Sequence, residues 1–344
     1  MDIVALCGGL SAERDVSITG GTLAAAALRR RGHRAVPVDL FLGYGQPYGD
    51  PKDIFKAVCA DEASAIGETA PDIDALRKGR GGDSRIGDNI PEICRAADMV
   101  FIALHGIYGE DGKIQAMLDL MGVKYTGTGV LGSAMAMNKA VSKQLFLQNG
   151  IQTPHGIVVN KRQRPYGNIG FPCVVKPCAN GSSVGVSVVR KCEDYPAALE
   201  LAFGYGDEAV VEQHIKGREC NVGILVGRAL PVIEIRTETG FFDYRNKYQS
   251  GMAEEICPAD LPPEITEKLQ RVAERVFRIL GFEVYGRMDF IVDEGGGVWC
   301  LEGNTLPGMT ASSLFPQEAA AAGITYDDLC EAIVYESLKK YEIT

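Results

Sequence analysis

The sequence predicts an α/β domain at the amino terminus, followed by two α+β domains. The chain of 344 residues is longer than one typical domain. A strand, a helix and a strand follow one another in residues 2–40, and such a βαβ unit implies a parallel sheet. The second half is rich in apolar runs joined by short loops, which are typical of antiparallel hairpins. We place the three domains at residues 1–127, 128–215 and 216–344.

Short apolar strands and helices build the first domain. Residues 2–7 (DIVALC) are typical of a buried strand, and the Ala-rich residues 17–31 favour a helix that ends at Gly32. Residues 43–97 carry many Gly, Pro and charged residues, so loops and short helices are expected there. The other elements expected in this domain are strands at 33–40 and 98–104 and a helix at 113–122.

Helices and strands alternate in the rest of the chain. The expected helices are 130–150, 194–203, 263–280 and 326–340. The expected strands are 172–177, 184–190, 209–215, 219–227, 229–236, 284–293 and 298–304. Because several neighbouring strands are joined by only a few residues, antiparallel pairing is favoured.

Composition argues against several classes of protein. The net charge of -10 and the pI of about 5.1 are unsuited to non-specific nucleic-acid binding, which needs clustered Lys and Arg. No apolar run approaches the roughly 18 to 20 residues of a membrane helix, and the first residues lack the features of a signal peptide. The 10 cysteines include no C-x-x-C pair, so we expect reduced thiols in a cytoplasmic protein rather than a zinc site.

An apolar strand, VWCLEGN (298–304), ends in a carboxylate and an amide two residues apart. The Gly-rich residues 294–297 predict a β-hairpin with the preceding strand, and pairing of Asp293 with Val298 would set its register. Since side chains alternate along a strand, four polar residues then share one face of the sheet. They are Arg287, Asp289, Glu302 and Asn304.

Asp289 lies opposite Glu302 in this register, with Cβ atoms about 4.5–5.5 Å apart. Two carboxylates this close repel each other unless a cation lies between them. Ligands that offer only oxygen favour Mg²⁺, which is usually held by one or two carboxylates and substrate phosphates. The pattern therefore predicts a nucleotide nearby. The alternative is a solvent-facing strand end, in which Arg287 compensates the negative charge.

A candidate phosphate-binding loop lies in VVKPCANGSSVGVSVV (174–189). Lys176 precedes a Gly-Ser-Ser-Val-Gly loop, whose backbone N–H groups and hydroxyls can approach phosphates. A Walker-type motif is absent from the sequence. Taken from these residues alone, an ordinary surface hairpin explains the loop equally well.

Motifs along nearly the whole chain resemble those of the D-alanine–D-alanine ligases, a family of the ATP-grasp superfamily. They occur in family order: GGLSAERDVS (8–17), LHGIYGEDGKIQ (104–115), YTGTG (125–129), MNKAVSK (137–143), VVKPCANGSSVGVS (174–187), FFDYRNKY (241–248), GRMDF (286–290) and LEGNTLPGMTASSL (301–314). The resemblance implies a three-lobed ATP-grasp architecture whose amino-terminal domain has a Rossmann-like parallel sheet. The chain departs from the family at Gln213, where many relatives have Lys, and residues 43–97 match no family motif.

Sites for ATP and for two Mg²⁺ or Mn²⁺ ions are implied by this resemblance. The loop 181–185 would cover the phosphates, residues 212–215 would read the adenine edge, and Glu219 would contact the ribose. The implied ATP-binding residues are Lys139, Lys176, Ser182, Ser183, Glu212, Gln213, Ile215, Glu219 and Lys247. The implied metal ligands are Asp289, Glu302 and Asn304, with Glu302 bridging the two ions.

The same resemblance assigns residues to the substrates and to catalysis. Glu13 would hold the ammonium group of the first D-alanine, near His105. Arg287 and the backbone N–H of Gly308 would stabilise the oxyanion, and Ser313 would bind the carboxylate of the second D-alanine. The implied catalytic residues are Glu13, Ser182, Tyr248, Arg287 and Gly308, and the implied substrate-binding residues are His105, Ser313 and Leu314.

The implied activity is the ATP-dependent joining of two D-alanine molecules through an acyl phosphate, for peptidoglycan precursor synthesis. A cytoplasmic homodimer is expected. One alternative is a relative that takes D-serine or D-lactate as the second substrate, although Lys247 and Tyr248, on a loop that closes over the site, favour D-alanine over D-lactate. Another is a non-catalytic ATP-binding protein of this fold, which would lack the metal or oxyanion residues that this chain retains.

Overall fold

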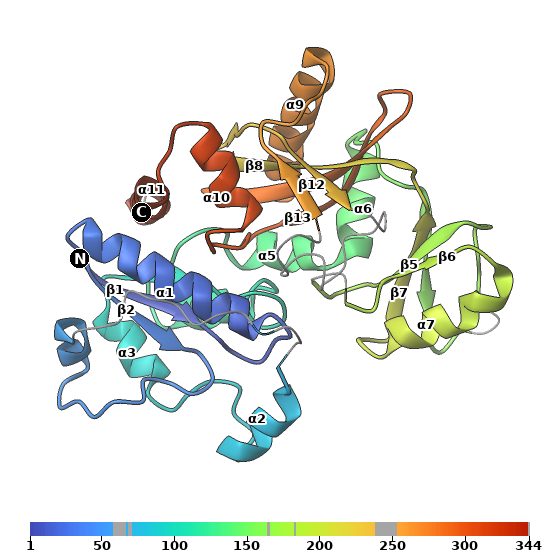
Figure 1. The fold of residues 1–344 in the computed structure, drawn as a ribbon. Coiled ribbons are helices and arrows are strands. Elements are labelled where there is room, and N and C mark those ends of the chain that lie inside the picture. Colours follow the sequence, from blue (N-terminus) through green and yellow to red (C-terminus); the bar gives the residue numbers. More distant parts are fainter. Residues whose placement is uncertain (58–66, 68–70, 164–165, 182–183, 238–252, 343–344) are drawn as a thin grey trace.

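Three separate sheets, each with its own helices, form three lobes in the computed structural model (Figure 1). The structure describes residues 1–344 except 58–66, 68–70, 164–165, 182–183, 238–252 and 343–344. The first sheet is parallel, and the other two are antiparallel. This arrangement confirms the predicted fold class.

The amino-terminal sheet has the strand order β2-β1-β3. Strands β1 and β3 are fully buried, and helices α1 and α3 pack on the sheet, as is usual for a parallel sheet. The short helices between β2 and β3 confirm the expectation for residues 43–97. The elements are β1 (Asp2–Cys7), α1 (Arg14–Arg30), β2 (Arg34–Asp39), the 3₁₀ helix η1 (Pro51–Lys56), α2 (Ile73–Arg80), α3 (Ile90–Ala96), β3 (Met99–Ile102) and α4 (Lys113–Leu120).

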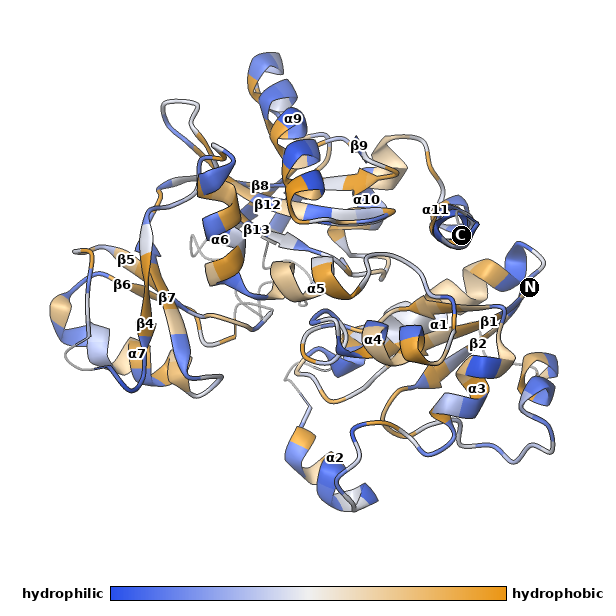
Figure 2. Ribbon diagram, turned by 180° about the vertical axis from the view of Figure 1, so that it is seen from behind, coloured by the Kyte–Doolittle hydropathy of each residue, from blue (hydrophilic) through white to orange (hydrophobic). Residues whose placement is uncertain are grey.

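A four-stranded sheet of order β4-β7-β5-β6 forms the second lobe. Helix α7 packs on β5 and β7 (Figure 2). Its apolar side chains share a core with theirs. Strand β4 was not expected from the sequence, and β6 is shorter than the predicted strand 184–190. The elements are β4 (Gly156–Asn160), β5 (Cys173–Pro177), β6 (Ser187–Val189), the 3₁₀ helix η2 (Cys192–Asp194), α7 (Tyr195–Phe203) and β7 (Glu208–Gln213).

The largest sheet has six strands in the order β11-β10-β8-β12-β13, with β9 paired to β8. Helix α9 packs against one face through Leu269, Ala273 and Val276, which are fully buried. The other face of the sheet carries polar side chains at the ends of β8, β12 and β13. The elements are β8 (Gly217–Leu225), β9 (Arg228–Ala229), β10 (Ile233–Thr237), β11 (Ala253–Ile256), α9 (Pro263–Ile279), β12 (Tyr285–Asp293) and β13 (Val298–Asn304).

The single helix predicted for residues 130–150 is wrong, because two helices occupy this range. They are α5 (Val130–Met137) and α6 (Lys139–Gln148). Asn138 between them has φ -89° and ψ 100°, which is an extended conformation, and its side chain accepts a hydrogen bond from the backbone N–H of Val141 at 3.1 Å. Asn138 therefore ends one helix and caps the next.

The last two helices are α10 (Leu314–Ala321), which was not expected, and α11 (Tyr326–Leu338), followed by the 3₁₀ helix η3 (Lys339–Tyr341). Helix α11 lies against α1, so the end of the chain returns to the first lobe (Figure 1). Its residues Leu329, Ile333 and Val334 are fully buried in the same core as β1 and β3. Among the described helices, none has the length and apolar character of a membrane span.

Candidate active site

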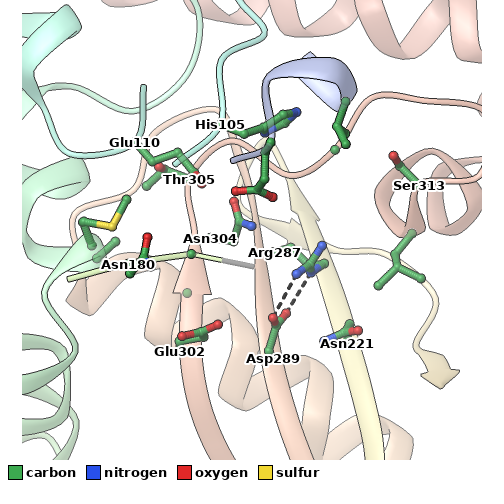
Figure 3. A pocket seen from close by; sticks show the side chains of 18 of the residues that line it. His105, Glu110, Asn180, Asn221, Arg287, Asp289, Glu302, Asn304, Thr305 and Ser313 are labelled. Atoms are coloured by element: carbon green, nitrogen blue, oxygen red, sulfur yellow. Dashed lines mark hydrogen bonds and ion pairs between the residues drawn. The ribbon is translucent and has the colours of Figure 1, made fainter. Parts of the chain in front are cut away.

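Residues from all three lobes line one pocket (Figure 3). The first lobe contributes the loops after β1 and β3, α5 and α6 contribute their junction, and the large sheet contributes its polar face. The lining includes many residues singled out from the sequence: Glu13, His105, Lys139, Glu219, Arg287, Asp289, Glu302, Asn304, Gly308, Ser313 and Leu314. Residues that lie far apart in the sequence therefore meet in one place.

The predicted pairing is confirmed where the β12–β13 hairpin reaches the pocket. Arg287 pairs with Asn304, and Asp289 pairs with Glu302. At the turn the prediction is wrong, because Val298 pairs with Val292 instead of Asp293. A register shift between Asp289 and Phe290 makes up the difference of one residue. The extra residue of this β-bulge lies on β13 and restores the predicted pairing at the pocket end of the hairpin.

The Asp293 side chain stabilises the turn of this hairpin. Its Oδ1 accepts hydrogen bonds from the backbone N–H groups of Gly295 at 2.9 Å and Gly297 at 2.7 Å. Its Oδ2 accepts one from Nε1 of Trp299 at 2.6 Å. The Asp293 side chain thus binds the turn, while its backbone remains in β12 and pairs with Gly217 of β8.

Arg287 and Asp289 form a two-pronged ion pair within the pocket (Figure 3). Nε of Arg287 donates to Oδ1 of Asp289 at 2.7 Å, and the terminal nitrogen donates to Oδ2 at 2.9 Å. Burial alone would lower the pKa of Arg287, but Asp289 outweighs it and raises that pKa. The guanidinium is therefore a fixed positive charge, as an oxyanion site requires.

Glu302, on the facing strand β13, forms an ion pair with a different side chain. Nζ of Lys139 lies 2.9 Å from Oε2 of Glu302 and also donates to the carbonyl of Asn180 at 2.8 Å. Lys139 is the first residue of α6, so the break at Asn138 directs it into the pocket. This contact joins α6, β13 and the β5–β6 connection around one ammonium group.

A buried cluster of charges lies beside the pocket on β5, β7 and α6. Glu212 is 1% exposed and forms ion pairs with Lys143, at 2.6 Å, and with Lys176. Burial raises the pKa of Glu212, but the two lysines outweigh it and keep that pKa below its ordinary value. Burial would likewise lower the pKa of Lys176, yet Glu212 and Glu302 hold it above its ordinary value. Two cations thus share one carboxylate, which leaves a net positive charge.

His105 and Glu110 line the side of the pocket that the first lobe provides. Nδ1 of His105 lies 3.0 Å from the carbonyl of Leu306, and burial lowers the pKa of the imidazole. Glu110 accepts a hydrogen bond from the backbone N–H of Gly106 at 2.6 Å. Burial, with a further contribution from Glu13, raises the pKa of Glu110 to about 8.

The loop between β13 and α10 closes the opposite side. Oγ of Ser313, at the N-cap of α10, accepts a hydrogen bond from the backbone N–H of Thr310 at 3.0 Å. A Cβ at position 308 would lie 2.6 Å from this oxygen, so a larger residue there would displace the Ser313 hydroxyl. Leu314 packs with Ile233 and Ile235 next to this turn.

Several expected residues lie elsewhere. Lys176, Glu212 and Gln213 are on β5 and β7, Ile215 follows β7, and the pocket lining does not include these four residues. Ser182, Ser183, Lys247 and Tyr248 fall outside the described residues. The residues that sequence reasoning missed are Glu110, Lys143, Asn180, Asn221 and Glu255.

The residues at the hairpin fit a divalent cation. Asp289, Glu302 and Asn304 offer only oxygen donors at one place, which is the chemistry that Mg²⁺ and Mn²⁺ prefer. An ion would share these carboxylates with Arg287 and Lys139. Within the described residues, no group of three or more His, Cys, Asp or Glu is placed to hold a metal ion.

Comparisons with known proteins agree with this geometry. The family model described as D-ala D-ala ligase N-terminus matches residues 2–128, and that described as D-ala D-ala ligase C-terminus matches residues 148–335. The D-alanine–D-alanine ligase of Pediococcus pentosaceus is 42% identical over 352 residues, covering 99% of this chain and 99% of the relative. That of Geobacter sulfurreducens is 42% identical over 335 residues, covering 96% and 92%.

A solved structure is similar over the same length. The D-alanine–D-alanine ligase of Bacillus anthracis, complexed with ATP, has a TM-score of 0.75 and 30% sequence identity, and the match covers 99% of each chain. A second structure of that protein has a TM-score of 0.73 and 31% identity. The similarity therefore extends over all three lobes.

Proposed function

Because the chain belongs to the D-alanine–D-alanine ligase family, we propose that it joins two molecules of D-alanine into D-alanyl-D-alanine with ATP, which becomes ADP and phosphate. The product is a precursor of peptidoglycan. The observation that carries the proposal is the hairpin constellation, in which Arg287 and Asp289 face Glu302 and Asn304 inside the pocket. A non-catalytic ATP-binding protein would have no need for this arrangement.

The chemistry requires activation of a carboxylate, since a carboxylate does not acylate an amine at neutral pH. The carboxylate of the first D-alanine attacks the γ-phosphate and forms an acyl phosphate. The amine of the second D-alanine then attacks the carbonyl carbon, and phosphate leaves. Two Mg²⁺ or Mn²⁺ ions, held by Asp289, Glu302 and Asn304, would neutralise phosphate charge when bound.

The chain's own groups orient the reactants. We assign the ammonium of the first D-alanine to Glu13, with His105 beside it. Arg287 and the backbone N–H of Gly308 point at the developing oxyanion, and each such donor lowers the barrier by about 2.7–4 kcal/mol. Ser313 takes the carboxylate of the second D-alanine. Leu314 packs at the same turn, where it limits the size of the second side chain.

ATP binds on the side of the pocket where Lys139 and Lys176 lie. Lys139 and Lys176 contact the phosphates together with Ser182, Ser183 and Lys247, and the buried Glu212 holds Lys176 in place. Residues 212–215 read the adenine edge, where Gln213 stands in place of the Lys of many relatives, and Glu219 contacts the ribose. We assign Lys247 and Tyr248 to a loop that closes over the site and excludes water from the acyl phosphate, and Tyr248 and Ser182 to a hydrogen-bonded set with Glu13.

Phosphate release from ATP with pairs of amino acids tests this function. We expect turnover with D-alanine alone, and D-alanyl-D-alanine as the product identified by mass spectrometry. Turnover only with D-alanine plus D-serine or D-lactate would contradict the assignment of the second substrate. Sedimentation of the purified protein tests the further proposal that it is a homodimer, for which the exposed side chains of Leu120 and Leu131 are candidate contacts.

A further inference from the structure

Glu255, on β11, lines the pocket but has no part in the function proposed above. In the large sheet, Ile235 of β10 pairs with Glu255 on one side and with Glu219 of β8 on the other. Directly opposed residues share a face of a sheet, so Glu255 lies on the same face as Glu219. The same face carries Asp289 and Arg287 on β12, the strand next to β8 and the third from β11.

Gln317 fixes the Glu255 carboxylate beside the beginning of α10. Its side-chain amide donates to Oε2 of Glu255 at 2.5 Å and to the carbonyl of Ser312 at 3.1 Å. Ser313, the N-cap of this helix, is the proposed partner of the second substrate's carboxylate. The carboxylate of Glu255 is thereby tied to the turn where the second substrate binds.

Glu255 differs from two other carboxylates of the pocket in the charge of the group that it contacts. Asp289 faces Arg287, and Glu302 faces Lys139, so each has a cation as its partner. The partner of Glu255 is a neutral amide. An amino acid whose carboxylate lies at the start of α10 brings an ammonium group into the pocket, and this group needs an anion within reach.

A buried amide nearby is also suited to a polar ligand. Asn221 lines the pocket, is 1% exposed and pairs with Asp289 on one side and Ile233 on the other. Neither its Oδ1 nor its Nδ2 has a hydrogen-bond partner within the described part of the chain. Buried polar groups are nearly always hydrogen-bonded, so the Asn221 amide is positioned to bond a polar group of a ligand.

We propose that Glu255 accepts the ammonium group of the second D-alanine and removes one proton from it. This inference rests on the proposed ligase function and deepens it. The free amine then attacks the carbonyl carbon of the acyl phosphate, and a C–N bond forms. The C–O bond to phosphate breaks, and the phosphate leaves with the remaining surplus proton of the nitrogen. Glu255 returns its own proton to solvent when the dipeptide leaves.

The surroundings of Glu255 suit this role. Burial raises its pKa above the ordinary value, against the opposing effects of the Gln317 hydrogen bond and of Arg287. A carboxylate whose pKa lies closer to the working pH is a better general base.

Glu255→Gln tests the proposal because it keeps the shape and removes the base. We expect dipeptide formation to fall about 100-fold or more. The first step, measured by positional isotope exchange in γ-labelled ATP with D-alanine, is expected to stay unchanged. Trapping of the acyl phosphate by hydroxylamine is also expected to be unchanged, since that nucleophile is already unprotonated at neutral pH. Glu255→Asp keeps the charge and is expected to recover part of the rate.

Glu254→Gln is the matched control, because Glu254 is the preceding residue of β11 and points to the opposite face, where it lies 3.8 Å from Arg236. Dipeptide formation by Glu255→Gln within about twofold of this control would overturn the proposal. Loss of isotope exchange and of trapping in Glu255→Gln would overturn it as well, because the effect would not be confined to the second step. Absence of exchange in the unmodified enzyme would instead overturn the ligase function, and this inference with it.

Discussion

Glu302 has two charged neighbours, a carboxylate and an ammonium group. It lies opposite Asp289 across the hairpin and 2.9 Å from the ammonium of Lys139. We predict that Glu302→Gln keeps the fold and loses at least about 100-fold in turnover, because a neutral amide cannot balance the charges of the cations that meet there. Steady-state phosphate release measures this loss. The control is Glu294→Gln in the exposed hairpin turn, and near-normal activity of Glu302→Gln would contradict the assigned role.

The carboxyl group of Glu110 predicts a pH dependence of stability. Burial, and then Glu13, raises its pKa to about 8 in the folded protein, above the ordinary 4.5. Between these two values the folded state holds a proton that the unfolded state has lost, so the free energy of unfolding falls as the pH rises through this window. Above the folded pKa this contribution is gone and the curve levels off.

Urea unfolding at about pH 5 and at about pH 8, compared with Glu110→Gln, isolates this effect. The variant has no proton to lose, so the unmodified protein should be destabilised relative to it at the higher pH. Parallel pH dependence in the two proteins would show that Glu110 does not titrate in this range.

At the scale of elements, the break between α5 and α6 positions Lys139, the residue that we propose contacts the ATP phosphates. Asn138 caps α6 and so directs Lys139 toward Glu302. We predict that Asn138→Ala lowers the free energy of unfolding by about 1 kcal/mol through loss of the cap. It should also raise the KM for ATP, because Lys139 is then held less firmly. The control is Asn149→Ala at the other end of α6, which should leave the KM for ATP unchanged.

Elements with a clear period could be predicted from the sequence, whereas their irregularities could not. Alternation in β12 and β13 was enough to place Asp289 and Glu302 on one face, because a strand has a period of two, but their direct pairing also needs the bulge. The bulge beside Asp289 depends on how Asp293 bonds the turn, which no periodicity reveals. The break in the helical run 130–150 could not be predicted either, because Asn138 is a polar residue within an otherwise helical pattern.

Pairings between distant elements were the hardest part of the site to predict. Lys143 lies four residues after Lys139 on α6, so the helical period could have indicated both. That Glu212 would lie between Lys143 and Lys176 depends on how α6 meets β5 and β7. Glu255 was missed because β11 was not expected as a strand.

For the molecule as a whole, α11 links the end of the chain to its beginning. Arg30 of α1 forms a two-pronged ion pair with Asp327, at 2.9 and 2.7 Å, but exposed ion pairs contribute only about 0–1 kcal/mol. The apolar contact is stronger, since Ile333 is fully buried in the core of the first lobe. The pocket receives Glu13 and His105 from that lobe, so α11 supports the site from a distance.

We therefore predict that Ile333→Ala lowers the free energy of unfolding by about 2–5 kcal/mol, whereas Tyr335→Ala on the exposed side of α11 has little effect. Hydrogen exchange locates the damage. Protection should fall in α1 and β1, which share a core with Ile333, and should persist in β12 and β13, which are packed against α9. Equal loss of protection in both regions would mean that the lobes unfold as one unit. Unchanged protection in α1 would mean that α11 does not stabilise the first lobe.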